Sequence, residues 1–278
     1  MRGAPPSAAL GGREPRRSSA SFVKDNRDIA RRQFGAHAEE YVKSVHHAKG
    51  ESLDRLIALT APRPEWRVLD VATGGGHTAL ALSPHVREVI ATDLTPEMLE
   101  AARGFLQSKG AKNVEFREAD ATALPFPDSE FDLATCRIAP HHFPDVALFV
   151  RELFRVVRHG GLAVVIDNMV PEDATAAEYI NNFERTRDPS HNWSYCESDW
   201  IRFFQEAGFG GLHVEFFRKA RDFDVWTGMV SVDEPTKERL RAMLADAPNR
   251  ARFALCPEEK NGALRFYLDE LLIRGTKP

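Results

Sequence analysis

The 278-residue chain lacks the features of a disulfide-rich, metal-clustered or membrane-spanning protein. Its three cysteines, Cys136, Cys196 and Cys256, form no CxxC pair, which argues against a disulfide framework or a zinc cage and fits a reducing compartment. No apolar run approaches the roughly 20 residues of a membrane helix. A formal net charge of −4 argues against a protein that binds nucleic acid through bulk charge.

Charge is unevenly distributed along the chain. Residues 1–33 contain eight basic and three acidic side chains, so they carry +5 and the remainder carries −9. The first 23 residues are rich in Arg, Ser, Gly and Pro, a composition typical of a disordered leader. A mitochondrial transit peptide is the alternative, but prolines, glycines and acids interrupt the amphipathic pattern that it requires. We therefore expect a flexible leader at 1–23 and a cytoplasmic protein.

After the leader, strands and helices alternate. The runs that read as strands are 66–71, 86–92, 114–117, 131–136 and 162–166, followed later by 212–217 and 263–273. This alternation predicts βαβ units, and we expect the last two strands to pair antiparallel at the sheet edge. The expected fold class is α/β, a Rossmann-like doubly wound sheet of seven strands, mostly parallel with an antiparallel edge strand.

The domain organisation follows from the same pattern. Residues 24–278 form one domain, in which 24–60 reads as a helical lid and 66–220 as a cofactor-binding core. Residues 221–278 read as a helical insert followed by the edge strand. A hydrophobic content of 43% is enough for a sizeable core and excludes global disorder.

The turn after the first strand, VLDVATGGG at 68–76, is the centre of the functional argument. Small residues let the backbone approach a ligand closely, and open α/β sheets bind ligands at this edge. Asp93 ends the second strand, 17 residues after Gly76, and can accept both hydrogen bonds of a ribose diol. Asp120 follows the third strand, where a carboxylate can receive an adenine amine. The pattern predicts an adenosine-containing cofactor.

Two classes of adenosine cofactor are compatible with this turn. The segment GGGHTA at 74–79 formally fits GxGxxA, which keeps an NAD(P)-dependent oxidoreductase open as an alternative. Asp70, however, would face a pyrophosphate with its negative charge. A carboxylate there is better suited to a cofactor that carries an amine and a sulfonium.

Four segments in order resemble the motifs of class I S-adenosylmethionine-dependent methyltransferases. They are VLDVATGGG, ATDLTPEMLEAA, EADATALPFPDSEFDLATCRIAPHHFPD and ELFRVVRHGGLAVVID. The closest resemblance is to the small-molecule branch similar to the ubiquinone and menaquinone C-methyltransferases, and it covers about residues 34–220. It implies S-adenosyl-L-methionine as the cofactor.

The resemblance also assigns roles to residues. It implies a methionine site from Asp70, Gly74 and Gly76 above Arg137, a ribose site at Asp93, and an adenine site from Leu94, Asp120 and Ala121. Ala72 replaces the family's usual first glycine, and Arg137 stands where many relatives have a small or neutral residue. The segment 33–41 resembles the family's lid, which would bring Tyr41 to the cofactor; a plain packing helix is the alternative.

His141 and His142 follow the fourth strand and face the expected mouth of the site. Either can take a proton from a phenol, enol or carbon acid near neutral pH, and we take His142 as the catalytic candidate. The alternative is that the pair only shapes the loop. The later run RTRDPSHNWSY could line an acceptor pocket, with Phe183, Trp193 and Tyr195 as apolar walls. We predict no metal site, because the His and Asp residues lack a ligand spacing.

The sequence therefore predicts a methyltransferase that acts on a small quinone-, phenol- or polyketide-like acceptor at carbon or oxygen. The alternatives are an NAD(P)-dependent oxidoreductase and a non-catalytic S-adenosylmethionine-binding partner protein. We expect no nucleic-acid partner and no membrane span. The sequence leaves the acceptor, the methylated atom and the oligomeric state open.

Overall fold

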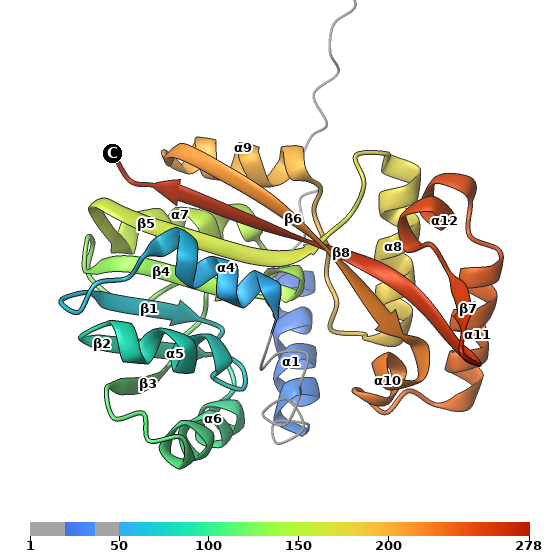
Figure 1. Ribbon diagram of the computed structural model, residues 1–278, viewed down its shortest axis with the longest axis horizontal. Coiled ribbons are helices and arrows are strands. Elements are labelled where there is room, and N and C mark those ends of the chain that lie inside the picture. The colour runs from blue at the N-terminus through green and yellow to red at the C-terminus, as the bar shows by residue number, and fades with distance from the viewer. Residues whose placement is uncertain (1–19, 37–49) are drawn as a thin grey trace, which may run out of the picture.

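The computed structural model describes residues 20–36 and 50–278, with side chains from residue 27 onward in the first range. Among these residues, eight strands form one sheet in the order β3-β2-β1-β4-β5-β8-β6, with β7 beside β8 (Figure 1). The strands are β1 (Arg67–Val71), β2 (Glu88–Asp93), β3 (Val114–Glu118), β4 (Phe131–Arg137), β5 (Val157–Met169), β6 (Gly210–Asp222), β7 (Glu258–Lys260) and β8 (Ala263–Thr276).

Ten α-helices and two 3-10 turns accompany the sheet in the described ranges. They are α1 (Ala20–Ala36), α4 (Glu51–Thr60), α5 (His77–Leu82), α6 (Pro96–Ser108), α7 (Val146–Val156), α8 (Ala174–Arg187), α9 (Glu197–Ala207), α10 (Phe223–Gly228), α11 (Glu234–Ala245), α12 (Asn249–Leu255), η1 (Ser83–His85) and η2 (Pro140–His142). No helix of the described chain is long and apolar enough to cross a membrane.

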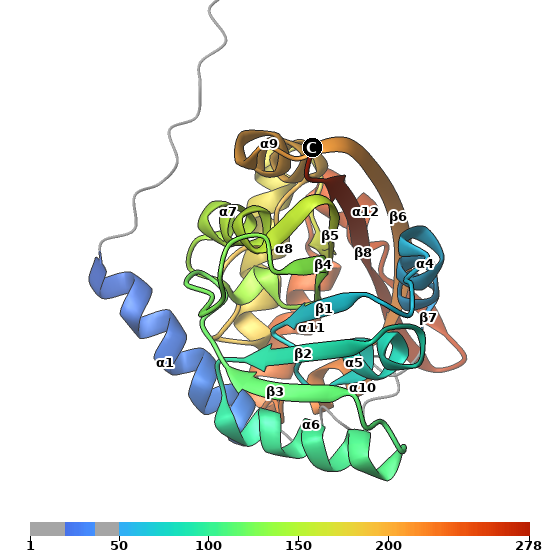
Figure 2. The same ribbon diagram turned by 90° about the vertical axis from the view of Figure 1, so that its left-hand side faces the viewer.

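Helices cover both faces of the sheet, as a doubly wound fold requires (Figure 2). On one face α4, α5 and α6 bury side chains such as Leu56 and Leu82 against the strands. On the other face α7 and α9 bury Phe149 and Trp200. Asp145 caps the amino terminus of α7, since it accepts a hydrogen bond from the Leu148 amide at 2.8 Å. The predicted α/β Rossmann-like class is confirmed.

The last strands behave differently from the rest. Strand β8 runs antiparallel to both neighbours, β5 and β6, so the expected antiparallel pairing at the sheet edge is confirmed. Both β6 and β8 extend past the ends of the parallel strands. Their extended part carries a smaller lobe made of α8, α10, α11, α12 and β7 (Figure 1). Its own hydrophobic cluster includes Phe183 stacked on Trp226, with ring centroids 5.1 Å apart. The sequence does not predict β7, because three charged residues give no apolar pattern.

The segment expected as a lid, 24–60, contributes two helices to the described structure, and they lie in different places. Helix α1 crosses the carboxyl edge of the parallel strands (Figures 1 and 2). Helix α4 packs on the sheet instead, with Leu53 and Leu56 buried, so it belongs to the core and not to a lid. The expected lid residue Tyr41 and most of the leader lie outside the described residues, and α1 already begins at Ala20.

Candidate active site

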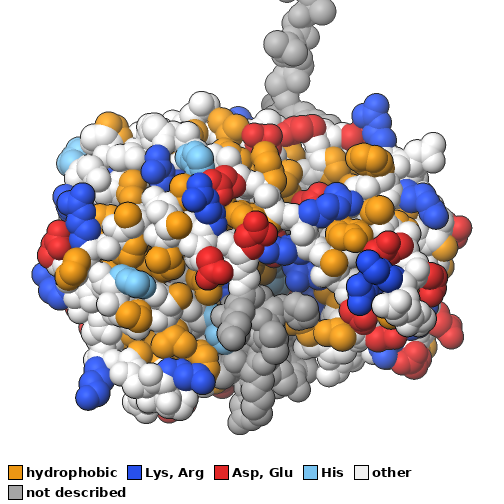
Figure 3. Space-filling model, viewed as in Figure 1, with side chains coloured by type: hydrophobic (Ala, Val, Ile, Leu, Met, Phe, Trp, Pro, Cys, Tyr) orange, Lys and Arg blue, Asp and Glu red, His pale blue; other side chains and the backbone are white. Residues whose placement is uncertain are grey.

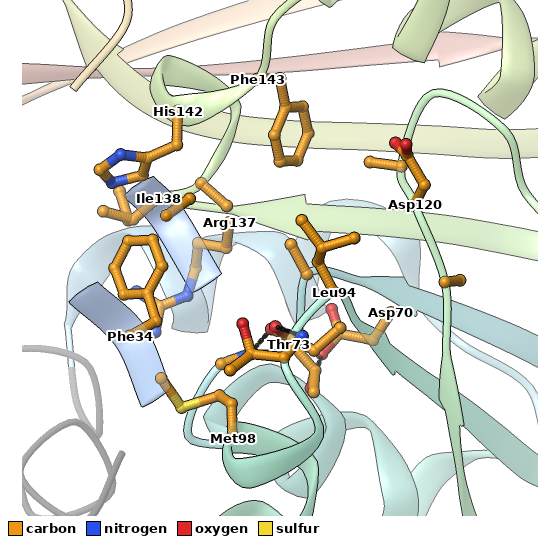
Figure 4. Close-up of a pocket in the computed structure, with 18 of the residues that line it drawn as sticks. Phe34, Asp70, Thr73, Leu94, Met98, Asp120, Arg137, Ile138, His142 and Phe143 are labelled. Atoms are coloured by element: carbon orange, nitrogen blue, oxygen red, sulfur yellow. Dashed lines mark hydrogen bonds between the residues drawn. The ribbon is translucent and has the colours of Figure 1, made fainter. Parts of the chain in front are cut away.

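A pocket opens at the carboxyl edge of the parallel strands, beside α1 (Figure 4). Its walls come from the turn after β1, the ends of β2 and β3, the segment after β4, and α1. The predicted site residues that line it are Asp70, Gly74, Asp93, Leu94, Asp120, Ala121, Arg137 and His142. Asp120 and Leu94 lie toward one end, and Phe34 and His142 lie toward the other (Figure 4).

Asp70 is buried at the end of β1. One carboxylate oxygen accepts from the Thr73 hydroxyl at 2.6 Å and the other from the Thr135 hydroxyl at 2.8 Å. Burial raises the pKa of Asp70 to about 6, although the two hydroxyls and the charge of Arg137 oppose the rise. The ionised carboxylate is therefore short of solvation, and a cation in the pocket would stabilise it.

The turn after β1 depends on left-handed backbone positions. Gly74 has φ 52° and donates its amide hydrogen to Asp93 at 3.0 Å. Gly76 has φ 82°, and a Cβ there would lie 2.5 Å from the Leu106 side chain. Gly76 thus lets α5 pack against α6, and it is not among the described residues that line the pocket. Ala72 has φ 51° and stands where the family has glycine.

Asp93 ends β2 with both oxygens engaged by backbone. Oδ2 accepts from the Gly74 amide and Oδ1 from the Thr95 amide, each at 3.0 Å. Burial raises the pKa of Asp93, and these amides act against the rise. These hydrogen bonds from backbone amides hold the Asp93 carboxylate at a fixed position in the pocket wall.

Asp120 contacts helix α1. Its Oδ1 accepts from the amide and the hydroxyl of Thr122, both at 2.8 Å. Its Oδ2 forms an ion pair with Arg27 at 2.9 Å, and Arg27 also donates to the Thr122 hydroxyl at 2.8 Å. The sequence did not predict that Arg27 contributes to the site, because nothing in the basic segment around it indicates which acidic side chain it pairs with. This ion pair ties α1 to the far end of the pocket.

Arg137 ends β4 and Ile138 follows it, both at the centre of the pocket (Figure 4). The Arg137 Nε donates to the Thr78 hydroxyl at 3.2 Å. Burial lowers the pKa of Arg137, and the charges of Glu270 and Asp70 oppose that effect. Ile138 has φ 54°, a strained value for a β-branched residue. Such strain is concentrated at ligand sites, where the surrounding structure maintains it.

His142 lies at the end of the pocket that is remote from Asp120. Its Nδ1 lies 3.0 Å from the Ser190 carbonyl oxygen and 3.1 Å from the Ser190 hydroxyl oxygen. Its ring packs edge-to-face on Phe34, with centroids 4.8 Å apart. Burial, together with the charge of His141, lowers the pKa of His142 to about 3. Sequence reasoning did not anticipate this lowered pKa, because burial and the neighbouring His141 both disfavour the imidazolium form of His142.

His141 lies behind His142 and is not part of the described pocket lining. Its Nδ1 is 2.6 Å from Asp167 Oδ1, and both side chains are buried. Burial opposes a charge on His141, but the attraction of Asp167 and its hydrogen bond outweigh it, and the pKa of His141 is raised. This pair lies directly beside His142, with the two imidazole ring centroids 4.1 Å apart.

The run at 185–195 does not form a pocket wall in the described structure. Phe183 belongs to the cluster of the smaller lobe, and Tyr195 packs on the core. The run contributes Ser190 instead, which contacts His142 from outside the pocket. Sequence reasoning also missed Thr73 and Thr135, although a hydroxyl three residues after Asp70 in a tight turn is a signal that could have found the first.

Comparisons with known proteins agree with this architecture. A family described as a methyltransferase domain matches residues 69–165. A Bacillus subtilis protein named uncharacterized methyltransferase YcgJ is 38% identical over 246 residues, which cover 88% of this chain and 97% of YcgJ. The YcgJ crystal structure has a TM-score of 0.78 at 37% identity and covers 81% of this chain and 97% of its own. A demethylmenaquinone methyltransferase of Thermus thermophilus is 40% identical over 134 residues, 47% of this chain and 60% of that protein.

The chain belongs to the family of S-adenosylmethionine-dependent methyltransferases. The predicted family, activity and cofactor are therefore confirmed. The comparisons give no support to an NAD(P)-dependent oxidoreductase or to a non-catalytic cofactor-binding protein.

Proposed function

We propose that this enzyme methylates oxygen or carbon of a small organic acceptor that carries an acidic proton, such as a phenol, quinol or enol. The observation that carries the proposal is His142, a neutral imidazole held at the end of the pocket by Ser190 and Phe34. One relative is named for demethylmenaquinone, a quinone acceptor, which supports this substrate class.

The pocket residues fit a cationic, adenosine-containing cofactor. Asp70 is a buried carboxylate with a raised pKa, so an amine or sulfonium nearby would stabilise its ionised form. We assign Asp70, Gly74 and Arg137 to the methionine part, Asp93 to the ribose, and Leu94, Asp120 and Ala121 to the adenine. Gly76 acts behind them through the packing of α5 on α6.

When bound, S-adenosylmethionine supplies an electrophilic methyl group whose bond to sulfur breaks with both electrons remaining on sulfur. The electron pair of the acceptor forms the new bond to the methyl carbon, and the lost proton passes to His142. A base with a pKa of about 3 is too weak to ionise a phenol beforehand. It accepts the proton readily once methylation has made the acceptor strongly acidic. The protein's main contributions are then orientation of the acceptor and exclusion of water.

The same proposal covers partners and location. We propose a small-molecule acceptor rather than nucleic acid, and a cytoplasmic enzyme with residues 1–23 as a leader. On the face shown in Figure 3, the described basic and acidic side chains are interspersed, which favours a small ligand over a polyanion. The domain that follows the leader then comprises a cofactor core and the lobe on β6 and β8.

The test combines binding and turnover in the full chain. Calorimetry should show binding of S-adenosylhomocysteine and none of NADH. A radiolabelled methyl donor should then label phenols, hydroquinones or 1,3-dicarbonyl compounds from a panel that also contains amines and thiols. Transfer confined to amines or thiols would contradict the proposal, because those acceptors need no hydroxyl or carbon proton to leave.

A further inference from the structure

The contact between His142 and Ser190 joins two distant parts of the chain. His142 ends η2 in the core, whereas Asp188 and Ser190 follow α8 of the smaller lobe. The two contacting residues are 48 positions apart in sequence. Both lobe residues are buried, with Ser190 fully enclosed and Asp188 4% exposed. This buried loop therefore supports His142 from the side away from the pocket.

In this loop Ser190 donates both its amide and its hydroxyl hydrogen to Asp188. Asp188 Oδ1 lies 2.6 Å from the Ser190 hydroxyl and 2.9 Å from the Ser190 amide, and an ionised carboxylate only accepts. The hydroxyl hydrogen is thus directed to Asp188, which leaves Ser190 Oγ as an acceptor toward His142. The Ser190 carbonyl oxygen also only accepts. Both contacts therefore require hydrogen on His142 Nδ1.

We propose that Asp188 and Ser190 are positioning residues that fix His142 as the Nδ1–H tautomer, so that Nε2 is the nitrogen that accepts the acceptor's proton. The inference rests on the proposed function for its catalytic meaning, but the tautomer itself is a property of the protein alone. It also narrows the substrate, since a neutral imidazole Nε2 orients an acceptor that presents a hydrogen-bond donor.

The charges around His142 agree with a neutral ring. His141, held by Asp167, and Arg187 disfavour the imidazolium, whereas Asp188 favours it. His191 lies 6.5 Å away between ring centroids, and its own pKa is lowered by burial and by His141. Burial opposes the ionised form of Asp188, but its hydrogen bonds with Ser190 and the charge of Arg187 act the other way, and the pKa of Asp188 is lowered. Asp188 consequently remains an acceptor across the neutral range.

The test reads the tautomer directly by nitrogen NMR of the full chain labelled with ¹⁵N-histidine. The His142 signals are assigned by their loss in His142→Gln. We expect a pyrrole-type Nδ1 and a pyridine-type Nε2 from pH 8 down to pH 5, with no change when S-adenosylhomocysteine is added. An Nε2–H tautomer in the wild-type protein would overturn the inference.

Three variants separate positioning from mere packing. Asp188→Ala frees the Ser190 hydroxyl to donate to Nδ1, so we expect an Nε2–H population and a transfer rate about tenfold lower. Asp188→Asn keeps an oxygen that accepts the same two hydrogens, and it should retain the Nδ1–H tautomer. The double variant Asp188→Ala/Ser190→Ala leaves the residue-190 carbonyl as the acceptor, so the Nδ1–H tautomer should return.

A purely structural role predicts the opposite order, with the double variant worse than the single one and no change of tautomer. Ser198→Ala, an exposed hydroxyl bonded to Glu172, is the matched control and should leave tautomer and rate unchanged. Failure of the wild-type protein to bind S-adenosylhomocysteine would count against the proposed function alone. Binding and transfer with an unmoved tautomer in Asp188→Ala would overturn the positioning inference alone.

Discussion

The two ends of the pocket are built in different ways. At the cofactor end, Asp70, Asp93 and Asp120 come from three neighbouring parallel strands of the core, at or just past their carboxyl ends. At the acceptor end, Phe34 comes from α1 and His142 from the core, with Ser190 of the smaller lobe behind it. The acids of the first end all come from residues 70–120 of the core, whereas the second end requires α1, the core and the smaller lobe to pack together.

The chemistry of the two ends differs in the same way. Parallel strands bring their carboxyl ends to one edge, so a few acids at strand ends suffice to attract a cationic cofactor. The acceptor end instead has His142, whose pKa is lowered by burial, beside the buried and hydrogen-bonded pair His141 and Asp167. Under the proposed function, the core specifies cofactor binding, and proton acceptance by His142 depends on how the smaller lobe packs against the core.

The largest effect should come from Asp70→Asn. This change removes the buried negative charge that faces the cofactor, and losing one member of a buried charge pair costs about 3 kcal/mol or more. The affinity for S-adenosylhomocysteine should therefore fall by more than about 100-fold in calorimetry. Asp54→Asn, an exposed acid on α4, is the control and should bind as the wild-type protein does. A loss below tenfold would show that the strand-end acids are not the basis of cofactor binding.

His142→Gln should affect only the acceptor end. Glutamine can still hydrogen-bond to Ser190 but cannot accept a proton at neutral pH. We expect transfer to fall about 30- to 100-fold, with unchanged binding of S-adenosylhomocysteine, because general base catalysis at its weaker end contributes about this much. His213→Gln, a partly exposed histidine paired with Glu215, should retain full transfer. Full turnover of the His142 variant would remove its catalytic role.

The two ends should also respond differently to pH. The pKa of Asp70 is raised to about 6 in the folded chain, so between about pH 4 and 6 the folded state binds more protons than the unfolded state. This group therefore stabilises the unliganded fold less as pH rises through that range. Ligand affinity should change in the opposite sense, falling by up to about tenfold per pH unit below pH 6.

His142, with a pKa of about 3, should contribute nothing to this dependence. Calorimetry between pH 5 and 8 checks the comparison, with Asp70→Asn expected to give a flat profile. A sloping profile that survives in Asp70→Asn but is lost in His142→Gln would reverse the assignment of the two ends.

The sequence predicted the cofactor end of the pocket better than the acceptor end. The strand-end acids and the glycine turn are local patterns, and the fold brings all of them except Gly76 to one pocket. The steric role of Gly76 was not predictable, because it depends on the approach of Leu106 from another helix. The outer part of β6 was also missed, since residues 218–222 lie beyond the predicted strand 212–217 and pair with the part of β8 that packs in the smaller lobe.

At the acceptor end, sequence reasoning found the histidine but not its environment. The pKa of His142 depends on burial and on the charge of His141, neither of which a sequence pattern states. Ser190 and Asp188 lay in a run that we expected to form a pocket wall, and they act from behind the wall instead. Contacts between segments that are far apart in sequence leave no periodic signal.

A smaller effect should follow from Arg27→Ala, which cuts the ion pair between α1 and Asp120. The pair is partly exposed, so its contribution to stability is within about 1 kcal/mol. We expect the dissociation rate of S-adenosylhomocysteine to rise about threefold, because α1 covers this end of the pocket less firmly. Arg31→Ala, which breaks the similar pair with Glu118 one turn along α1, is the matched control. Equal rates for both variants would mean that α1 does not retain the ligand through Asp120.

The smallest effect concerns strain at the cofactor end. Ala72 has φ 51°, a left-handed conformation that costs a residue with a Cβ about 1 kcal/mol or more. Glycine removes this cost but adds freedom to the unfolded chain, so Ala72→Gly should raise the free energy of unfolding by about 0.5 kcal/mol in urea titrations. Ala101→Gly, in the middle of α6, should lower it by about 1 kcal/mol. If both substitutions destabilise equally, the turn is not strained at Ala72, and the alanine fits its place in the cofactor loop as well as the glycine of other family members does.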